Sequence, residues 1–163
     1  MVDARPTGRC GANGDVMVEI EERAVIASPR TEVFAAAADP ERQLVWDEGT
    51  LRSVEKLSDG PLGEGSCFRG DFKGFGDVTY EFSSYEPGRV FAHRAKVKMG
   101  TMTHTFSFED GPDGTVVTQH GVLEPNVLGR VMSPMIKRMF RKRFRLINSE
   151  LDGYLATAPA GES

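Results

Sequence analysis

Short extended stretches separated by turn residues fill the middle of the chain, and they limit most strongly what it can fold into. Six such stretches run from Leu51 to Leu57, Ser66 to Lys73, Asp77 to Glu86, Arg89 to Met99, Thr101 to Glu109 and Thr115 to Leu123. The segments between them contain Gly or Pro, as in Pro87-Gly88 and Gly100, which supply tight-turn conformations. Because such short links join neighbouring strands as hairpins, the pattern predicts an antiparallel meander.

The segment before the meander predicts one more strand and two short helices. Met17 to Ala27 first alternates and then turns apolar, which suits a half-buried strand. Ser28-Pro29 is a helix-start signal, because Ser28 can accept hydrogen bonds from free backbone amides and Pro29 suits the first helical position. Asp39-Pro40 repeats the signal and predicts a second short helix, which brings Trp46 to the end of the sheet.

A long amphipathic segment follows the last strand. Asn126 to Ala156 carries apolar residues at helical spacing over its whole length, which predicts one helix. A helix of roughly 28 residues would be about 40 Å long, enough to cross a seven-stranded sheet. Since an antiparallel sheet needs a cover on one face, we predict an α+β helix-grip fold, in which the curved sheet wraps around this helix and leaves a gap between them.

Composition places the chain among ordinary globular proteins. With 39% hydrophobic and 27% charged residues, one folded domain is expected at residues 16–157, between a disordered leader at residues 1–15 and a disordered tail at residues 158–163. No apolar run approaches the roughly 20 residues of a membrane span and no secretory signal is evident, so we expect a cytoplasmic protein. Two cysteines, Cys10 and Cys67, are too few for a disulfide framework.

Charge is distributed unevenly along the chain. Residues 127–149 contain seven Lys or Arg residues and no carboxylate, which leaves 13 basic and 24 acidic residues elsewhere, a net charge of -11. An acidic body disfavours nucleic acid as a partner. Five of the basic residues lie opposite the apolar face of the helix, namely Lys137, Arg138, Arg141, Lys142 and Arg145. A solvated surface is the simplest interpretation, and weak contact with an anionic membrane or an acidic protein is the alternative.

The order of the elements and several short motifs resemble a known family. The motifs are Ser28-Pro29-x-x-x-Val33-Phe34, Trp46-Asp47, Gly63-x-Gly65-Ser66, Tyr85-Glu86-Pro87-Gly88-Arg89 and Asp113-Gly114-Thr115. Over about Val18 to Leu155, the chain resembles the polyketide cyclase/dehydrase branch of the START and Bet v 1-like (SRPBCC) superfamily. That superfamily includes lipid carriers, hormone receptors, aromatase/cyclases and co-chaperones, so the resemblance implies an internal ligand cavity and leaves its chemistry open.

Strand alternation predicts which side chains line the cavity, because residues two apart share a face. The sheet residues predicted to line it are Phe68, Phe72, Tyr80, Phe82, Phe91, His93, Met102, His104, Phe106 and Phe108. His93 and His104 could anchor a ligand carbonyl or transfer a proton, although hydrogen-bonded core histidines are the simpler interpretation. Trp46 either closes the cavity mouth or caps the core.

The long helix supplies four further predicted lining residues. Met132, Met135 and Met139 form either core or a deformable wall that adapts to a ligand. Arg143 is the basic residue on the apolar face, and a buried guanidinium needs a carboxylate of the sheet or a ligand oxygen as its partner, unless the side chain extends to the helix edge. His93, His104 and Arg143 are therefore the candidate catalytic residues.

Three functions are compatible with these features. The favoured one is a carrier or sensor that binds an apolar lipid, polyketide or aromatic metabolite. The alternatives are an enzyme that promotes cyclisation or dehydration of a polyketide in the same cavity, and an interaction protein that uses the basic helix. The sequence has no phosphate-binding loop, no Gly-x-Ser-x-Gly and no close His or Cys pairing, so we predict neither a cofactor nor a metal. Monomer and dimer are equally compatible.

Overall fold

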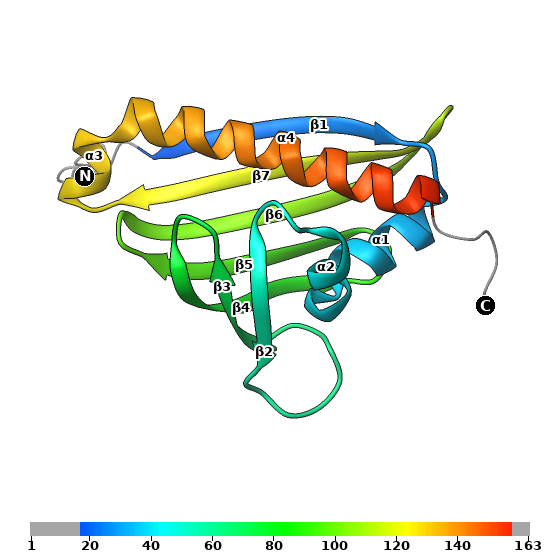
Figure 1. The fold of residues 1–163 in the computed structure, drawn as a ribbon, viewed down its shortest axis with the longest axis horizontal. Helices are drawn as coiled ribbons and strands as arrows, with labels where there is room; N and C mark the ends of the chain where they lie inside the picture. The colour runs from blue at the N-terminus through cyan, green and yellow to red at the C-terminus, as the bar shows by residue number, and fades with distance from the viewer. Residues whose placement is uncertain (1–16, 158–163) are drawn as a thin grey trace, which may run out of the picture.

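A curved antiparallel sheet of seven strands packs against one long helix (Figure 1). The computed structural model describes residues 17–157, so the predicted leader and tail lie outside the described residues. The strands lie side by side in the order β1-β7-β6-β5-β4-β3-β2. The elements in chain order are β1 (Val18–Ile26), α1 (Arg30–Ala38), α2 (Pro40–Trp46), β2 (Leu51–Lys56), β3 (Cys67–Phe72), β4 (Gly76–Glu86), β5 (Val90–Val97), β6 (Gly100–Gly111), β7 (Gly114–Pro125), α3 (Val127–Val131) and α4 (Ser133–Thr157). The predicted helix-grip fold is therefore confirmed.

The C-terminal helix is broken, whereas the sequence predicted one continuous helix. α3 ends at Val131, Met132 has a non-helical conformation, and α4 begins at Ser133. Pro134 explains the break, because it has no backbone N–H to donate to Arg130 four residues earlier and its ring crowds that turn. Asn126 starts α3 instead, with its side-chain oxygen accepting from the backbone N–H of Gly129 at 3.0 Å.

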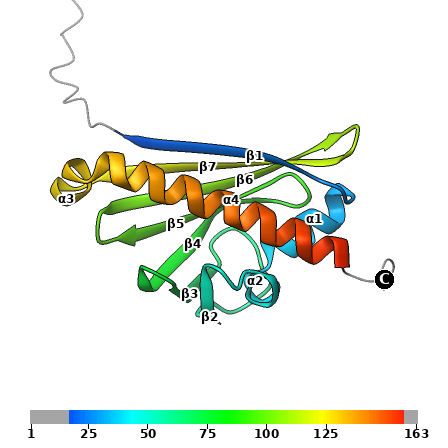
Figure 2. The same ribbon diagram turned by 45° about the horizontal axis from the view of Figure 1, so that its top comes forward.

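α4 runs along the concave side of the sheet, and α1 and α2 lie at one end of it, beside the C-terminal half of α4 (Figures 1 and 2). The interior is divided accordingly into two buried clusters. One gathers around α1 and includes Phe34, Phe82, Phe91 and Leu151. The other gathers around the first half of α4 and contains, among others, Ile136, Phe140 and Phe144. A cavity lies between these two clusters.

Candidate functional site

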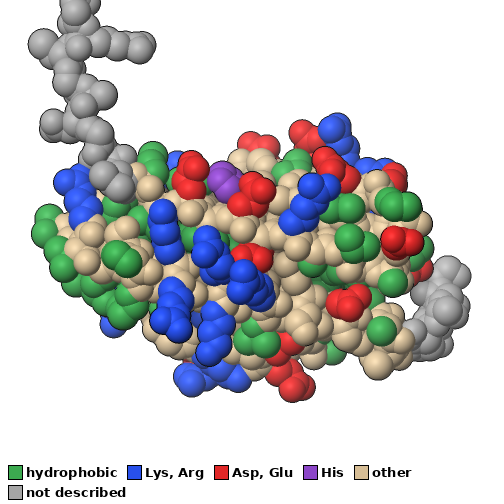
Figure 3. Space-filling view, turned by 90° about the horizontal axis from the view of Figure 1, so that it is seen from above, with side chains coloured by type: hydrophobic (Ala, Val, Ile, Leu, Met, Phe, Trp, Pro, Cys, Tyr) green, Lys and Arg blue, Asp and Glu red, His purple; other side chains and the backbone are tan. Residues whose placement is uncertain are grey.

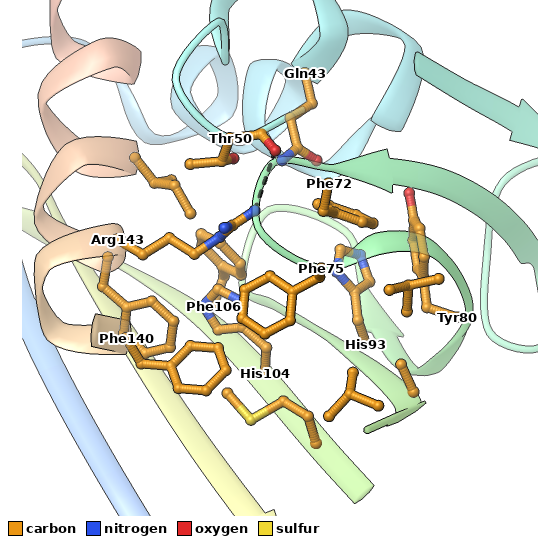
Figure 4. A pocket seen from close by; sticks show the side chains of 16 residues that line it. Gln43, Thr50, Phe72, Phe75, Tyr80, His93, His104, Phe106, Phe140 and Arg143 are labelled. Atoms are coloured by element: carbon orange, nitrogen blue, oxygen red, sulfur yellow. Dashed lines mark hydrogen bonds between the residues drawn. The ribbon is translucent and has the colours of Figure 1, made fainter. Parts of the chain in front are cut away.

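The cavity lies between α4, the α2–β2 connection, the β3–β4 hairpin and the inner face of the sheet (Figure 4). It encloses about 120 Å³. Its walls are mostly aromatic and aliphatic, and they consist of Gln43, Thr50, Phe72, Phe75, Val78, Tyr80, His93, Ala95, Val97, Met102, His104, Phe106, Phe140, Arg143, Phe144 and Ile147. A largely apolar pocket with few polar groups is the form that small-molecule sites usually take.

Strand register brings the two histidines into this wall as direct neighbours. His93 of β5 pairs with His104 of β6, and Ala95 pairs with Met102. Across the next strand, Tyr80 of β4 pairs with Ala95. Because side chains two apart share a face, three adjacent strands present one continuous inner surface.

Among the residues that line the cavity, Tyr80 and His93 have buried polar atoms without a hydrogen-bond partner in the described part of the chain. Their rings lie 4.9 Å apart, centroid to centroid (Figure 4). The Tyr80 hydroxyl and His93 Nε2 are both buried, and neither finds a hydrogen-bond partner within residues 17–157. Desolvation by burial lowers the pKa of His93 to about 3 and raises the pKa of Tyr80 above its ordinary value. Both side chains are therefore neutral at pH 7, and each can still form a hydrogen bond.

His104, in contrast, is held by a chain of buried amides. Its Nε2 lies 3.0 Å from Gln119 Oε1, while Gln119 Nε2 donates to Asn148 Oδ1 at 2.6 Å and to the Phe144 carbonyl at 2.9 Å. Since the Gln119 amide nitrogen faces two acceptors, its oxygen must accept, and His104 Nε2 carries the proton. Burial is the main reason that the pKa of His104 falls to about 3, so Nδ1 keeps its lone pair at neutral pH.

Arg143 reaches from α4 across the cavity and donates to two backbone carbonyls. Nη1 bonds the Lys73 carbonyl at 2.9 Å and Nη2 bonds the Thr50 carbonyl at 3.1 Å, the bond drawn as a dashed line in Figure 4. The guanidinium carbon also lies 5.0 Å from the centre of the Phe75 ring. Desolvation lowers its pKa, an effect that nearby Asp47 opposes. The sequence left the partner of Arg143 open between a sheet carboxylate, a ligand oxygen and solvent at the helix edge. In the structure its partners are two backbone carbonyls at the edge of the cavity.

A carboxylate pair supports the segment to which Arg143 is bonded. Asp47 is fully buried and accepts from Gln43 Nε2 at 2.7 Å and from the Thr50 hydroxyl at 2.5 Å. Glu150 of α4 lies beside it, and desolvation, followed by the interaction with Asp47, raises the pKa of Glu150 to about 7. Asp47 thereby fixes Gln43 and Thr50, which both line the cavity.

The structure places seven of the fifteen predicted lining residues at this cavity and eight elsewhere. Those at the wall are Phe72, Tyr80, His93, Met102, His104, Phe106 and Arg143. Phe68, Phe82, Phe91 and Phe108 do face inward, but they belong to the core cluster around α1. α1 fills that end of the sheet, since Phe34 contacts Phe91 and Phe108 edge to face at 5.8 and 5.3 Å. These four rings therefore belong to the core and do not line the cavity.

The remaining four predicted residues also lie away from the cavity. Trp46 caps the core, where its indole N–H donates to the Ala36 carbonyl at 3.0 Å. Met132 packs on the second core cluster, and Met135 and Met139 are exposed. The rotation of α4 explains this, because it turns Phe140, Arg143, Phe144 and Ile147 toward the cavity.

Nine lining residues were missing from the predicted set. Phe140, Phe144 and Ile147 stand at helical spacing from Arg143, so that spacing could have identified them. Ala95 and Val97 follow His93 at strand spacing, and Val78 precedes Tyr80 in the same way. Gln43, Thr50 and Phe75 lie in the second short helix, a loop and a turn, where no periodicity marks a side chain as inward-facing.

Two further properties of the described residues bear on the chemistry. Residues 17–157 contain no group of three or more His, Cys, Asp or Glu side chains arranged to hold a metal ion. In the same part of the chain, no helix combines the length and the apolar character that crossing a bilayer requires.

Comparisons with known proteins agree with this architecture. The Zhui aromatase/cyclase from Streptomyces sp. R1128 has a TM-score of 0.73 at 17% identity, over 90% of this chain and 99% of that one. The di-domain aromatase/cyclase BexL from the BE-7585A biosynthetic pathway has a TM-score of 0.74 at 15% identity, over 90% of this chain and 52% of that one. Ara h 8.0201 has a TM-score of 0.66 at 10% identity, over 87% of this chain and 99% of that one.

These structural likenesses, at low identity, concern the fold. A comparison of the sequence with curated proteins gives no significant match. The sequence profile of the family described as "Polyketide cyclase / dehydrase and lipid transport" matches residues 17–155, which is most of the chain. The chain therefore belongs to the polyketide cyclase/dehydrase and lipid transport family.

Proposed function

We propose that the protein binds a small, largely apolar molecule carrying a polar oxygen, and that it acts as a carrier or sensor of that molecule. The observation that carries the proposal is the pair of unpartnered polar atoms, Tyr80 Oη and His93 Nε2, in a mostly apolar wall. A buried polar group without a partner costs about 1 to 3 kcal/mol, and a ligand hydroxyl or carbonyl would remove that cost. Membership of a family that includes lipid transport is consistent with this role.

The charge states of the polar lining residues indicate what kind of ligand would bind. His93 and His104 both remain uncharged at pH 7, and burial keeps the Tyr80 phenol protonated. Arg143, the charged group of the wall, already donates to two carbonyls. A neutral aromatic or aliphatic alcohol, phenol or ketone therefore fits the site better than an anion does.

A calorimetric comparison of 2-naphthol with naphthalene tests this proposal. We expect the wild-type protein to bind 2-naphthol more tightly, because the hydroxyl can pair with Tyr80 or His93. Tyr80→Phe should lower the 2-naphthol affinity about fivefold to tenfold and leave naphthalene binding unchanged. The matched control is Tyr154→Phe, at a tyrosine outside the cavity. Equal affinity for the two compounds in the wild-type protein would remove the proposed role of the polar pair.

Native mass spectrometry of protein purified without added ligand provides an independent test. A co-purifying neutral lipid, polyketide or aromatic compound is the expected result. If the bound compound proves to be a phosphate ester or another polyanion, the prediction of a neutral ligand is wrong.

A second candidate function, a cyclase that acts on a poly-β-ketone, is supported by the same two side chains, His93 and Tyr80. His93 could take a proton from the carbon between two carbonyls while Tyr80 donates to the enolate oxygen. Attack of that carbon on a second carbonyl would form the new C–C bond, and the proton on His93 would return to the resulting alkoxide. Elimination of water would then complete a dehydration. Holding the chain in a reactive shape would supply most of the rate enhancement.

We favour binding without catalysis because His93 is only a weak base. A histidine whose pKa is about 3 is a weak proton acceptor, and the site shows no charged partner that strengthens it. The test is turnover of a synthetic poly-β-ketone by the wild type, by His93→Ala and by His120→Ala. His120 is the matched control, since it follows inward-facing Gln119 on β7 and does not line the cavity. Turnover that is lost in His93→Ala alone would establish the enzyme.

A further inference from the structure

The N-terminal part of the C-terminal helical region has an unusually apolar exposed surface. Val127 and Val131 of α3 are 78% and 77% exposed, and Met135 of α4 is 54% exposed. Leu128 and Met139 are exposed as well. Figure 3 shows hydrophobic side chains gathered over the α3 end of the molecule, with a band of Lys and Arg side chains beside them. We call these five apolar residues and the basic residues beside them, Arg138 and Lys142, the α3–α4 surface.

The basic residues of this surface are free to meet an external anion. Within residues 17–157, the structure shows no carboxylate paired with Arg138 or Lys142, and both are exposed. Their neighbours differ, because Arg141 and Arg145 both pair with Glu22, at 3.4 and 3.2 Å. The whole segment 127–149 contains no Asp or Glu that could neutralise the surface locally.

We infer that the α3–α4 surface docks on an anionic lipid bilayer. Exposed aliphatic and Met side chains flanked by unpaired Lys and Arg have the composition of a helix lying in the membrane interface: the apolar groups enter the acyl boundary and the cations meet lipid phosphates. A protein partner fits less well, since protein interfaces are enriched in aromatic residues and depleted in Lys, whereas none of the five exposed apolar residues here is aromatic and one of the two cations is Lys.

The position of this surface relative to the cavity adds a second argument. Arg143, which lines the cavity, stands on the same helix as Met139 and Leu146, which are 37% and 40% exposed. At 100° per residue, Met139 and Leu146 lie about 40° and 60° from Arg143, on the same side of it. The exposed apolar edge of α4 therefore runs directly beside the cavity, so that docking would bring the cavity close to the acyl chains. This inference goes beyond the proposed function and does not depend on it.

Vesicle co-sedimentation of the full chain tests the inference. We expect binding to vesicles of phosphatidylcholine mixed with phosphatidylserine, little binding to phosphatidylcholine alone, and weaker binding as salt rises. Arg138→Gln combined with Lys142→Gln should lower the affinity for the mixed vesicles about 25-fold, since each cation near the surface is worth about fivefold. Val131→Ser should lower the affinity about tenfold by removing an inserted apolar group.

Matched controls separate surface docking from general charge and from folding. Arg42→Gln combined with Arg89→Gln removes two exposed cations at the α1–α2 end of the molecule, away from the α3–α4 surface, and should leave vesicle binding unchanged. Val131 and the cations are exposed, so circular dichroism should show each variant folded. Equal losses in both double variants, equal binding to both kinds of vesicle, or retention of an acidic polypeptide such as polyglutamate without any vesicle binding would each overturn the inference.

Discussion

Replacement of Gln119 by Met is expected to destabilise the fold and to do so through polar groups. Gln119 is fully buried and joins His104, Asn148 and the Phe144 carbonyl. Met has a similar volume, so packing changes little, but His104 Nε2 and Asn148 Oδ1 lose their partners. At about 1 to 3 kcal/mol for each unsatisfied buried group, the free energy of unfolding should fall by about 2 to 5 kcal/mol, allowing for the apolar atoms gained.

A second substitution distinguishes the polar explanation from a packing effect. Asn148→Leu removes the stranded amide, so Gln119→Met with Asn148→Leu should recover about 1 to 3 kcal/mol relative to Gln119→Met alone. Urea unfolding followed by circular dichroism measures the single variants and the double variant, and an unchanged denaturant slope shows that the comparison is valid. A loss under about 0.5 kcal/mol for Gln119→Met, or strictly additive losses in the double variant, would refute the argument that buried amides order this wall.

Three further predictions concern titration, helix propensity and the cavity edge. His93 and His104 have folded pKa values of about 3, below the unfolded value of 6.5, so the unfolded state takes up protons first as the pH falls. The free energy of unfolding should therefore decrease by up to about 1.4 kcal/mol per pH unit per histidine below pH 6.5. An acid unfolding midpoint that His93→Leu leaves unchanged would contradict this. Gly153→Ala should raise the free energy of unfolding by about 0.5 to 1 kcal/mol, because Gly153 lies within α4 with open space around it and Ala favours a helix more than Gly does. A lower free energy of unfolding in urea would show that the added methyl group clashes with a neighbour. Arg143→Met should speed amide hydrogen exchange at residues 73–76 while global stability changes little, because Arg143 joins the Lys73 and Thr50 carbonyls at the cavity edge to α4. Unchanged exchange at these residues would show that Arg143 does not hold the cavity edge.

The sequence was sufficient to predict the fold because its turns and periodicities are local signals. Gly60, Gly74, Gly76, Gly88, Gly100 and Gly114 all have positive φ, so they mark turns or strand ends where other residues are strained. The alternation on β5 and β6 likewise predicted correctly that His93 and His104 face inward. The break at Met132 was missed because the apolar spacing continues across it, although Pro134, eight residues after Asn126, disfavours a helix interior.

The division of inward residues between core and cavity could not be predicted from strand alternation. Alternation gives the same face to Phe91 and His93, yet one packs under α1 and the other lines the cavity. That difference depends on where α1 ends and on how α4 is rotated, which are tertiary properties. A register shift between Phe82 and Ser84 adds a residue to β4 and changes the alternation beyond it. Phe75 lines the cavity only because its hairpin folds back toward α4, a position no local pattern specifies.

The chain has a single tryptophan, and its position determines what its fluorescence reports. Trp46 is 6% exposed, hydrogen-bonded to α1, and outside the cavity wall, although Gln43 of the same short helix lies in it. Its emission should therefore be blue-shifted in the native state and follow loss of the α1–α2 cover during unfolding. A spectral change on addition of a non-absorbing ligand would mean that this cover has shifted, since the indole itself cannot contact the cavity contents.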